Sequence, residues 1–319
     1  MSVIKNLIYK FSIFMAMLFV FGLSLLISPQ YVNGDQLHYR ATYEVVSSLS
    51  FIEGYLQYNL LLSSYEYVHY SLIWVFSRFL DKDVFIAFSN AFLVYFLLIN
   101  LDKIRVYAPL AIILVLTNFY LFVLYFAAER LKYGMVFFLL SLYYIERVKV
   151  FYPFVILSLT AHAQFLIIYA GIAFRNLRNL IWRFFTKGLI SKTVFFFFIL
   201  AFVVVILLNK QIFSKFIAYY DSINIFDLWK MFIFFALSLW YSKKKRLDAL
   251  FIFIPLIIAA ALFGGERVNI FGYFVFMYYA LQVNRGVNFG VLATTLYFGV
   301  QAYFFVENIV LYGDGFYAG

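Results

Sequence analysis

Residues 11–27, FSIFMAMLFVFGLSLLI, contain no charged side chain and decide the class of fold. About 20 consecutive apolar residues, with a lower limit near 17, form a helix that crosses the roughly 30 Å hydrocarbon core of a bilayer. Lys5 and Lys10 precede this stretch as in a signal peptide, but no small-x-small cleavage site follows before Pro29. We therefore expect a retained first membrane helix, with the N-terminus in the cytoplasm.

The composition of the whole chain has the same character as this first stretch. Of its 319 residues, 66% are hydrophobic and 13% are charged, and the mean hydropathy is +0.93. Soluble domains average about 45–50% apolar and about 25% charged residues. A soluble enzyme, a nucleic-acid-binding domain and a disordered protein are therefore excluded. The sequence predicts an all-α polytopic integral membrane protein with a single transmembrane domain over residues 1–319.

Further apolar segments follow the first one and set the expected number of helices. They lie at 84–101, 107–125, 131–147, 150–174, 193–209, 227–242, 249–263, 268–283 and 288–308. With re-entrant and interfacial pieces allowed, they predict about 9–11 transmembrane helices. Pro109 and Pro153 are expected in first helical turns, where a missing N–H costs little, and Pro255 is expected inside its helix.

Two regions are more polar than the rest. Residues 29–83 form a predicted first external loop, in which 41–62 reads as one interfacial helix and 66–80 is too short to span comfortably. Residues 175–192 are rich in lysine and arginine and are expected to form a basic cytoplasmic loop. Because the chain has no cysteine and only three histidines, we expect no metal site and no cofactor.

The lysines and arginines leave two topologies open. In the first, 66–80 and the segment around His162 enter the membrane without crossing it. Asp35 and the two Glu-Arg pairs, at 129–130 and 266–267, then reach one outer face. In the second, both segments span, and the 129–130 pair falls on the opposite side. Both topologies satisfy the positive-inside rule equally, so the convergence of charged groups favours the first.

Asp35 is the first candidate for chemistry, because charged groups near membrane depth are costly and are functional candidates. It stands in Asn33-Gly34-Asp35-Gln36-Leu37-His38-Tyr39, just after the first helix. A carboxylate there can accept the proton of an attacking sugar hydroxyl if it lies within hydrogen-bond reach. The alternative interpretation is a solvated turn, since Asn-Gly-Asp is also a turn sequence.

The second candidate is a pair of similar junctions, Ala127-Ala128-Glu129-Arg130 and Gly264-Gly265-Glu266-Arg267. Each places a Glu-Arg dipeptide where one apolar helix ends and another begins. An arginine fork at a helix start suits phosphate oxygens, and Lys132 lies in the first turn with Arg130. The junctions therefore indicate a diphosphate clamp. The alternatives are a salt-bridged interfacial loop or arginines bound to lipid headgroups.

His162 is the third candidate, because it stands in the middle of the apolar run 150–174. It could bind phosphate or donate a proton, or it could be a buried histidine bonded to a backbone carbonyl. Glu53, Glu66 and His69 form a weaker set, which could shape a groove for an acceptor or simply face water.

These residues carry a resemblance to a known family. Gly34-Asp35-Gln36-Leu37-His38-Tyr39 resembles the first-loop acid-and-tyrosine motif of GT-C-type membrane glycosyltransferases and EpsG-like polysaccharide polymerases. Glu66, opening a short helix, is similar to that family's Glu-Pro segment. Arg130 resembles its Arg-Gln helix start, Thr160-Ala161-His162-Ala163-Gln164 its Phe-His site, and Arg267 its late arginine. The order and spacing of these motifs cover most of the chain.

The resemblance implies a GT-C-like fold and a Wzy-type polymerase of O-antigen or capsule in the bacterial inner membrane, with a periplasmic active face. Such metal-independent glycosyltransferases move a growing glycan from undecaprenyl diphosphate to another lipid-linked repeat unit. Both lipid-linked glycans and the bilayer are then partners, together with a chain-length regulator and a flippase of the same pathway, and no nucleic acid is expected.

On this interpretation Arg130 and Arg267 hold the leaving diphosphate, and Asp35 and His162 are the catalytic residues. Lys132 assists at the diphosphate. The remaining candidates line or support the acceptor path: His38, Tyr39, Glu53, Glu66, His69, Glu129 and Glu266. Two alternatives stay open, a lipid-linked oligosaccharide flippase and a membrane acyltransferase that modifies surface sugars.

Overall fold

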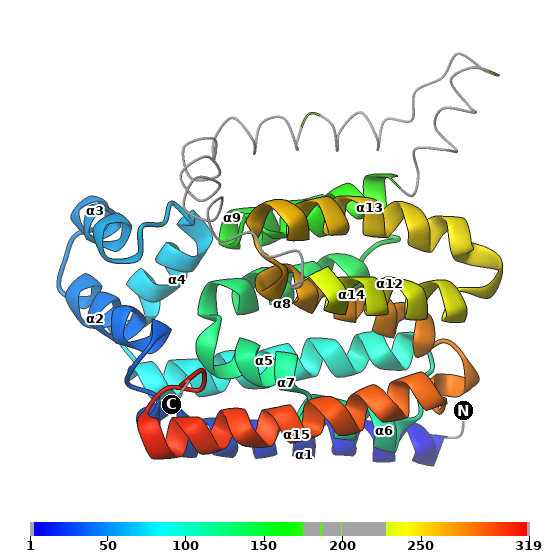
Figure 1. Cartoon of the computed structure of the whole chain (residues 1–319). Coiled ribbons are helices and arrows are strands. Elements are labelled where there is room, and N and C mark those ends of the chain that lie inside the picture. Colours follow the sequence, from blue (N-terminus) through cyan, green and yellow to red (C-terminus); the bar gives the residue numbers. More distant parts are fainter. Residues whose placement is uncertain (1–2, 175–185, 187–198, 200–227, 318–319) are drawn as a thin grey trace. The chain divides into compact units, whose positions relative to one another are not determined.

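A computed structural model describes residues 3–174, 186, 199 and 228–317 (Figure 1). Within these ranges the regular elements are all helices. Nearly all of the predicted basic loop 175–192 and of the apolar segment 193–209 lies outside the described residues. The chain divides into two compact units. Unit 1 comprises Met1–His162 and Arg285–Gly319, and unit 2 comprises Ala163–Asn284.

Unit 1 is built on long apolar helices. α1 (Val3–Ile27) packs along α5 (Lys82–Lys103), where Phe21 and Phe88 meet edge to face with ring centroids 4.9 Å apart. α15 (Phe289–Tyr312) follows the short η5 (Asn284–Gly286) and packs on α6 and α7. Leu7–Gln30, Lys82–Lys103 and Asn284–Tyr312 are long and apolar enough to cross a membrane.

A fourth candidate span is broken. α6 (Ala108–Thr117) and the helix that follows it meet at a bend of 55°. Asn118 lies at the break, and its side chain accepts a hydrogen bond from Leu121 N at 3.3 Å, which caps α7 (Phe119–Phe122). The part of the chain that the structure describes therefore contains three candidate spans, or four with the bent pair. This is compatible with a helical membrane protein, and the larger predicted number stays a prediction.

The break continues into an irregular turn before the next helix. η2 (Val123–Ala127) is a π-helical turn, in which Ala128 N donates to Val123 O at 2.8 Å. α8 (Glu129–Tyr143) begins directly after Ala128 and pairs with α9 (Val148–Ala161). π-helical turns are rare and frequently lie at functional sites. Here the turn brings the charged start of α8 into the interior of unit 1.

The first loop contains three short helices, two of which replace the single helix predicted over 41–62. α2 (Asp35–Ser47) and α3 (Phe51–Leu62) are separate because Ser50 begins a new helix. Glu53 N donates to Ser50 Oγ and Ser50 N donates to Glu53 Oε2, both at 3.4 Å, which makes a reciprocal capping box. α4 (Tyr67–Phe76) has ten residues, which confirms that this segment is too short to span.

Two prolines lie at the helix positions that the sequence predicts, and a third does not. Pro109 is in the first turn of α6, and Pro255 is inside α13 (Arg246–Phe263). The expectation for Pro153 is wrong, because α9 begins at Val148 and the proline falls inside it.

Unit 2 contains α12 (Trp229–Tyr241), η4 (Lys243–Lys245), α13 and α14 (Gly265–Ala280), together with the apolar helix Phe165–Phe174. Gly171 allows this last helix to lie against α13. A Cβ at position 171 would stand 2.9 Å from the carbonyl oxygen of Ile252. Phe165 and Phe271 meet edge to face in the same unit, with ring centroids 5.2 Å apart.

Candidate functional site

The buried carboxylate of Glu66 joins three elements of unit 1. Arg130 Nη1 lies 3.2 Å from Glu66 Oε2, and His162 Nδ1 contacts Glu66 Oε1. Ser64 donates to Glu66 Oε2 at 2.9 Å, and Arg130 Nε donates to the hydroxyl of Tyr39 at 3.2 Å. Glu66 is only 2% exposed, so both charges of the ion pair are largely shielded from water. We call Tyr39, Glu66, Arg130 and His162 the Glu66 cluster.

Helix ends place each member of this cluster. Glu66 is the residue before α4, Arg130 is the second residue of α8, and His162 follows the last residue of α9 in an extended conformation. Tyr39 is one turn after Asp35 on α2, so the two residues share a face of that helix. Helix ends expose unpaired backbone groups and are the usual places for charged and hydrogen-bonding side chains.

The electrostatics of Glu66 favour its ionised form. Burial by itself would raise the pKa of Glu66, but the charges of His162 and Arg130 and the contact from His162 outweigh it. The pKa of this carboxyl is therefore held well below its usual range. A carboxylate that stays ionised can orient the imidazole through Nδ1, the arrangement in which a histidine acts as acid or base.

His69 lies completely buried beside this cluster. Its Nδ1 is 2.8 Å from the hydroxyl of Tyr58, and its ring contacts the rings of Tyr39 and Tyr133 at centroid distances of 5.9 and 5.5 Å. Burial lowers the pKa of His69 to about 3, although Glu129 and Glu66 act in the opposite direction. The imidazole is therefore neutral at physiological pH.

A second group of charges gathers at Glu129, the first residue of α8. Lys82 Nζ lies 3.0 Å from Glu129 Oε1, and Gln36 Nε2 donates to the same oxygen at 2.8 Å. Gln36 also contacts the carbonyl oxygen of Phe126 in the π-helical turn. Lys82 Nζ is 5.3 Å from the centroid of the Tyr39 ring, so this group adjoins the Glu66 cluster.

Lys132 is buried one turn further along α8 and has no exposed surface. Its Nζ donates to Asn90 Oδ1 at 2.8 Å and to Tyr125 O at 3.3 Å. Asn90 Nδ2 in turn donates to Ser24 Oγ of α1 at 2.9 Å. Both acceptors of the Lys132 ammonium group are neutral oxygens.

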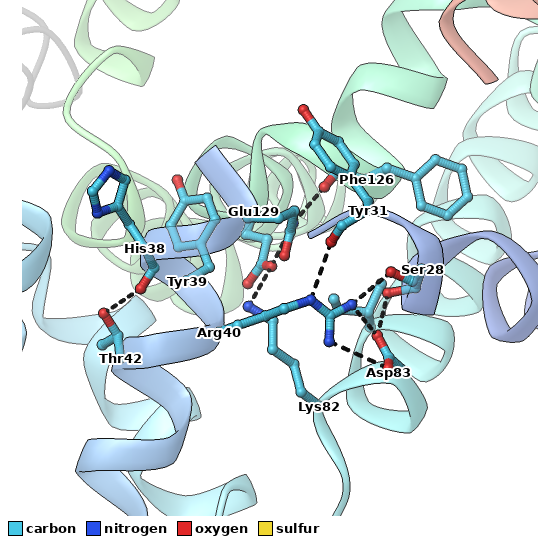
Figure 2. A network of polar contacts seen from close by, with 12 residues as sticks. Ser28, Tyr31, His38, Tyr39, Arg40, Thr42, Lys82, Asp83, Phe126 and Glu129 are labelled. Atoms are coloured by element: carbon cyan, nitrogen blue, oxygen red, sulfur yellow. Dashed lines mark hydrogen bonds and ion pairs between the residues drawn. The ribbon is translucent and has the colours of Figure 1, made fainter. Parts of the chain in front are cut away.

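Arg40 forms a third, complete ion pair with Asp83 (Figure 2). Its guanidinium reaches both carboxylate oxygens, at 2.6 and 3.3 Å, and the carbonyl oxygens of Ser28 and Tyr31, at 2.5 and 3.1 Å. Ser28 Oγ donates to Asp83 Oδ1 at 2.6 Å. This group fastens α2 to the end of α1 and the start of α5.

Asp35 is exposed at the start of α2 and is held through the loop before it. Val32 N and Asn33 N both donate to the carbonyl oxygen of Gly313, at 3.1 and 2.8 Å. Tyr31 donates through its hydroxyl to Asp314 Oδ1 at 3.2 Å. The turn at residues 312–316 therefore fixes the backbone that leads into the candidate base.

The remaining predicted residues lie apart from these groups. His38 is exposed on α2, and Glu53 is exposed in the capping box of α3. The side chains of Glu266 and Arg267 are outside the described part of the structure, so their predicted share in a diphosphate clamp stays a prediction. Among the described residues, no group of three or more His, Cys, Asp or Glu could hold a metal ion.

Sequence reasoning missed Lys82, Gln36 and Tyr58. Lys82 lies just before the apolar segment 84–101, a position where lysines usually mark membrane topology, and so the sequence carried no signal of its burial. Gln36 and Tyr58 could have been suspected only from helical periodicity, because Gln36 is one turn before Arg40 and Tyr58 is one turn before the end of α3.

The arrangement offers two kinds of chemistry in one place. Arg130 and Lys82 supply positive charge for an anion, and the Glu66–His162 pair supplies an oriented acid or base.

No family model, no curated protein and no solved structure matches this chain.

Proposed function

We propose that the protein is a membrane glycosyltransferase that polymerises undecaprenyl-diphosphate-linked repeat units into O-antigen or capsular polysaccharide. The observation that carries this proposal is the Glu66 cluster, in which four side chains from separate elements converge in the interior of a strongly apolar protein. Buried ionisable groups in such proteins are costly and mark functional sites by default.

The groups match the needs of glycosyl transfer. In the proposed reaction an acceptor hydroxyl attacks the anomeric carbon of the donor glycan, and the bond from that carbon to the diphosphate oxygen breaks. The diphosphate leaves with the bonding electron pair, and Asp35 takes the hydroxyl proton. Arg130, with Arg267 as its predicted counterpart, stabilises the negative charge on the leaving group, which is usually a large catalytic contribution.

Within this proposal Glu66 is a positioning residue. It holds Arg130 on one side and orients the imidazole of His162 on the other. We place the reaction on the periplasmic face of a bacterial inner membrane, with a GT-C-like arrangement of about 9–11 spans and the N-terminus in the cytoplasm. Chain-length regulator and flippase proteins of the same pathway are the proposed partners.

The test is complementation of a deletion strain, with the polysaccharide resolved on gels. Wild-type protein should restore the ladder of long chains. D35N and R130Q should leave single repeat units on the lipid A core. The matched control is E44Q, which removes an exposed carboxylate further along the same helix as Asp35 and should restore the ladder.

Wild-type ladders from both D35N and R130Q would overturn the proposal. Lipid-linked repeats that accumulate on the cytoplasmic face of the deletion strain would instead indicate the flippase. An unchanged chain length with altered sugar decoration would indicate the acyltransferase.

A further inference from the structure

We infer that Lys82 and Arg130 together bind a phosphate-type anion next to Tyr39. This inference rests on the proposed function, in which the anion is the diphosphate of the lipid-linked donor. It assigns a ligand-binding role to Lys82, a residue that the motifs of the sequence did not single out.

The first argument is a surplus of buried basic side chains over carboxylates. Lys82, Arg130 and Lys132 lie in the interior of unit 1 with only the two carboxylates of Glu66 and Glu129, so that one positive charge has no counter-ion when all three are protonated. Glu66 is engaged by Arg130, Glu129 is engaged by Lys82, and Lys132 donates only to neutral oxygens. An unbalanced buried charge is unfavourable, and a bound anion would neutralise it.

The second argument is that several buried polar groups around Tyr39 lack a well-aligned hydrogen-bond partner among the described residues. Within the described residues, Lys82 Nζ and Arg130 Nη1 are close to carboxylates but make no hydrogen bond of good geometry, and His69 Nε2 and the Tyr133 hydroxyl have no hydrogen-bond partner. The side chain of Lys82 is only 7% exposed. Buried polar groups are almost always satisfied, so a cluster of unsatisfied ones indicates a polar ligand.

The neighbouring pair of Arg40 and Asp83 shows what a purely structural ion pair looks like in the same region. Its guanidinium meets both carboxylate oxygens and two backbone carbonyls, and none of its atoms is left without an acceptor among the described residues (Figure 2). Lys82 lies on the same helix as Asp83 but is not satisfied in this way. The contrast favours a ligand at Lys82 over a structural role.

Two helix starts add to the positive potential at this place. Lys82 is the first residue of α5, and Arg130 is the second residue of α8. The residue before α8, Ala128, provides no side-chain cap for its N–H groups. The N-terminal end of a helix carries a partial positive charge and unpaired N–H groups, both of which attract anions.

The experiment measures thermal unfolding of the full chain in nanodiscs. The additions are inorganic pyrophosphate, undecaprenyl diphosphate and, as a lipid control, undecaprenol. Both phosphate compounds should raise the Tm of the wild type, and undecaprenol should not. The double variant K82Q/E129Q replaces the charged pair with a neutral pair of similar size, so that no lone charge is buried. It should lower the affinity for both phosphate compounds at least about tenfold, because a hydrogen bond to a charged group is lost.

The matched control is R40Q/D83N, which neutralises the structural pair between α2 and α5, next to Lys82 in the sequence, and should leave the affinity unchanged. K82R keeps the charge and should retain most of the affinity. Stabilisation by pyrophosphate alone supports the anion site with a soluble phosphate as its ligand. No phosphate-dependent shift in the wild type, or an equal shift in K82Q/E129Q, overturns the inference.

These experiments distinguish a failure of the anion site from a failure of the proposed function. Phosphate binding that depends on Lys82, in a protein whose deletion leaves polysaccharide chains unchanged, supports the anion site and rejects the polymerase. Normal polymerisation by K82Q/E129Q with unchanged affinity rejects the anion site and keeps the polymerase.

Discussion

Glu66 and Arg130 form a buried ion pair, with Oε2 and Nη1 3.2 Å apart and side-chain exposures of 2% and 16%. Each residue also binds a second partner, His162 for the carboxylate and Tyr39 for the guanidinium. The pair therefore links α2, α4, α8 and the end of α9. Breaking this pair should therefore change both the stability and the activity of the protein.

Removing one charge of this pair should destabilise the protein strongly. E66Q leaves Arg130 buried without its counter-ion, and such changes cost about 3–5 kcal/mol. We expect the low end of that range, because the arginine is partly exposed. E66Q/R130Q removes both charges and should cost less than the sum of the two single variants. Chemical unfolding in detergent micelles measures all three, and additive losses would contradict a direct interaction.

The contribution of Glu66 should also depend on pH. Because its pKa is lowered in the folded state, its stabilisation is complete above the ordinary carboxyl pKa of 4.5 and is lost as the pH falls below that value. The stability difference between the wild type and E66Q should therefore shrink at acid pH. A difference that stays constant down to about pH 3 would show that the charge of Glu66 contributes nothing.

Because of His69, the free energy of unfolding should also depend on pH in a range closer to neutrality. Its folded pKa of about 3 lies below the ordinary value of 6.5, so the folded protein binds fewer protons than the unfolded chain between these values. Stability should be complete above pH 6.5 and fall below it, by about 1.4 kcal/mol per pH unit for one proton. H69Q should remove this slope. H38N, which changes an exposed histidine of α2, should keep it.

Gly34 should tolerate no side chain. Its φ is +57°, and a Cβ built on it would lie 2.9 Å from both carboxylate oxygens of Asp314. G34A should therefore destabilise the protein by about 1–3 kcal/mol and displace the start of α2, which carries Asp35. The measurements are the free energy of unfolding and the polysaccharide ladder. G34A/D314A removes the clash but not the backbone strain, so it should recover part of both.

In unit 2, the close contact of Gly171 with the backbone of Ile252 leads to a prediction about stability. G171A would push a methyl group against the backbone carbonyl of Ile252, which cannot rotate away, and should cost about 1–3 kcal/mol. The control is G22A in α1, where nothing lies within 4 Å of the added carbon. Alanine there should be neutral or stabilising by up to about 1 kcal/mol. Equal effects in thermal unfolding would contradict the packing of these two helices.

The positions of the helices could largely be predicted from the sequence. Apolar runs are long and are interrupted by charges or prolines, so the predicted segment 84–101 coincides closely with α5, and 11–28 covers the later part of α1, which begins at Val3. The division of 41–62 into two helices was missed because the hydrophobic pattern does not change at the break. Only the capping box of Ser50 and Glu53 marks it, and that signal is local.

The candidate site could be predicted only in part. Ionisable residues in apolar surroundings stand out, as Arg130 and His162 do, whereas Glu66 lies in the more polar region 29–83 and carries only a weak signal. No pattern in the sequence indicated that Arg130 binds Glu66 and Tyr39, and its predicted share with Arg267 in a diphosphate clamp stays a prediction. Pairings across long sequence separations depend on how helices pack, and a single sequence carries no record of that.

The turn at residues 312–316 has a consequence for how the protein is assembled. Asp35 emerges from the ribosome early, but the carbonyl of Gly313 that holds its loop is made almost 280 residues later. While the intervening helices are being inserted, the loop has no permanent partner. The site is therefore completed only when α15 arrives, and a chain that stops before it would carry the ionisable groups but present Asp35 on an unanchored loop.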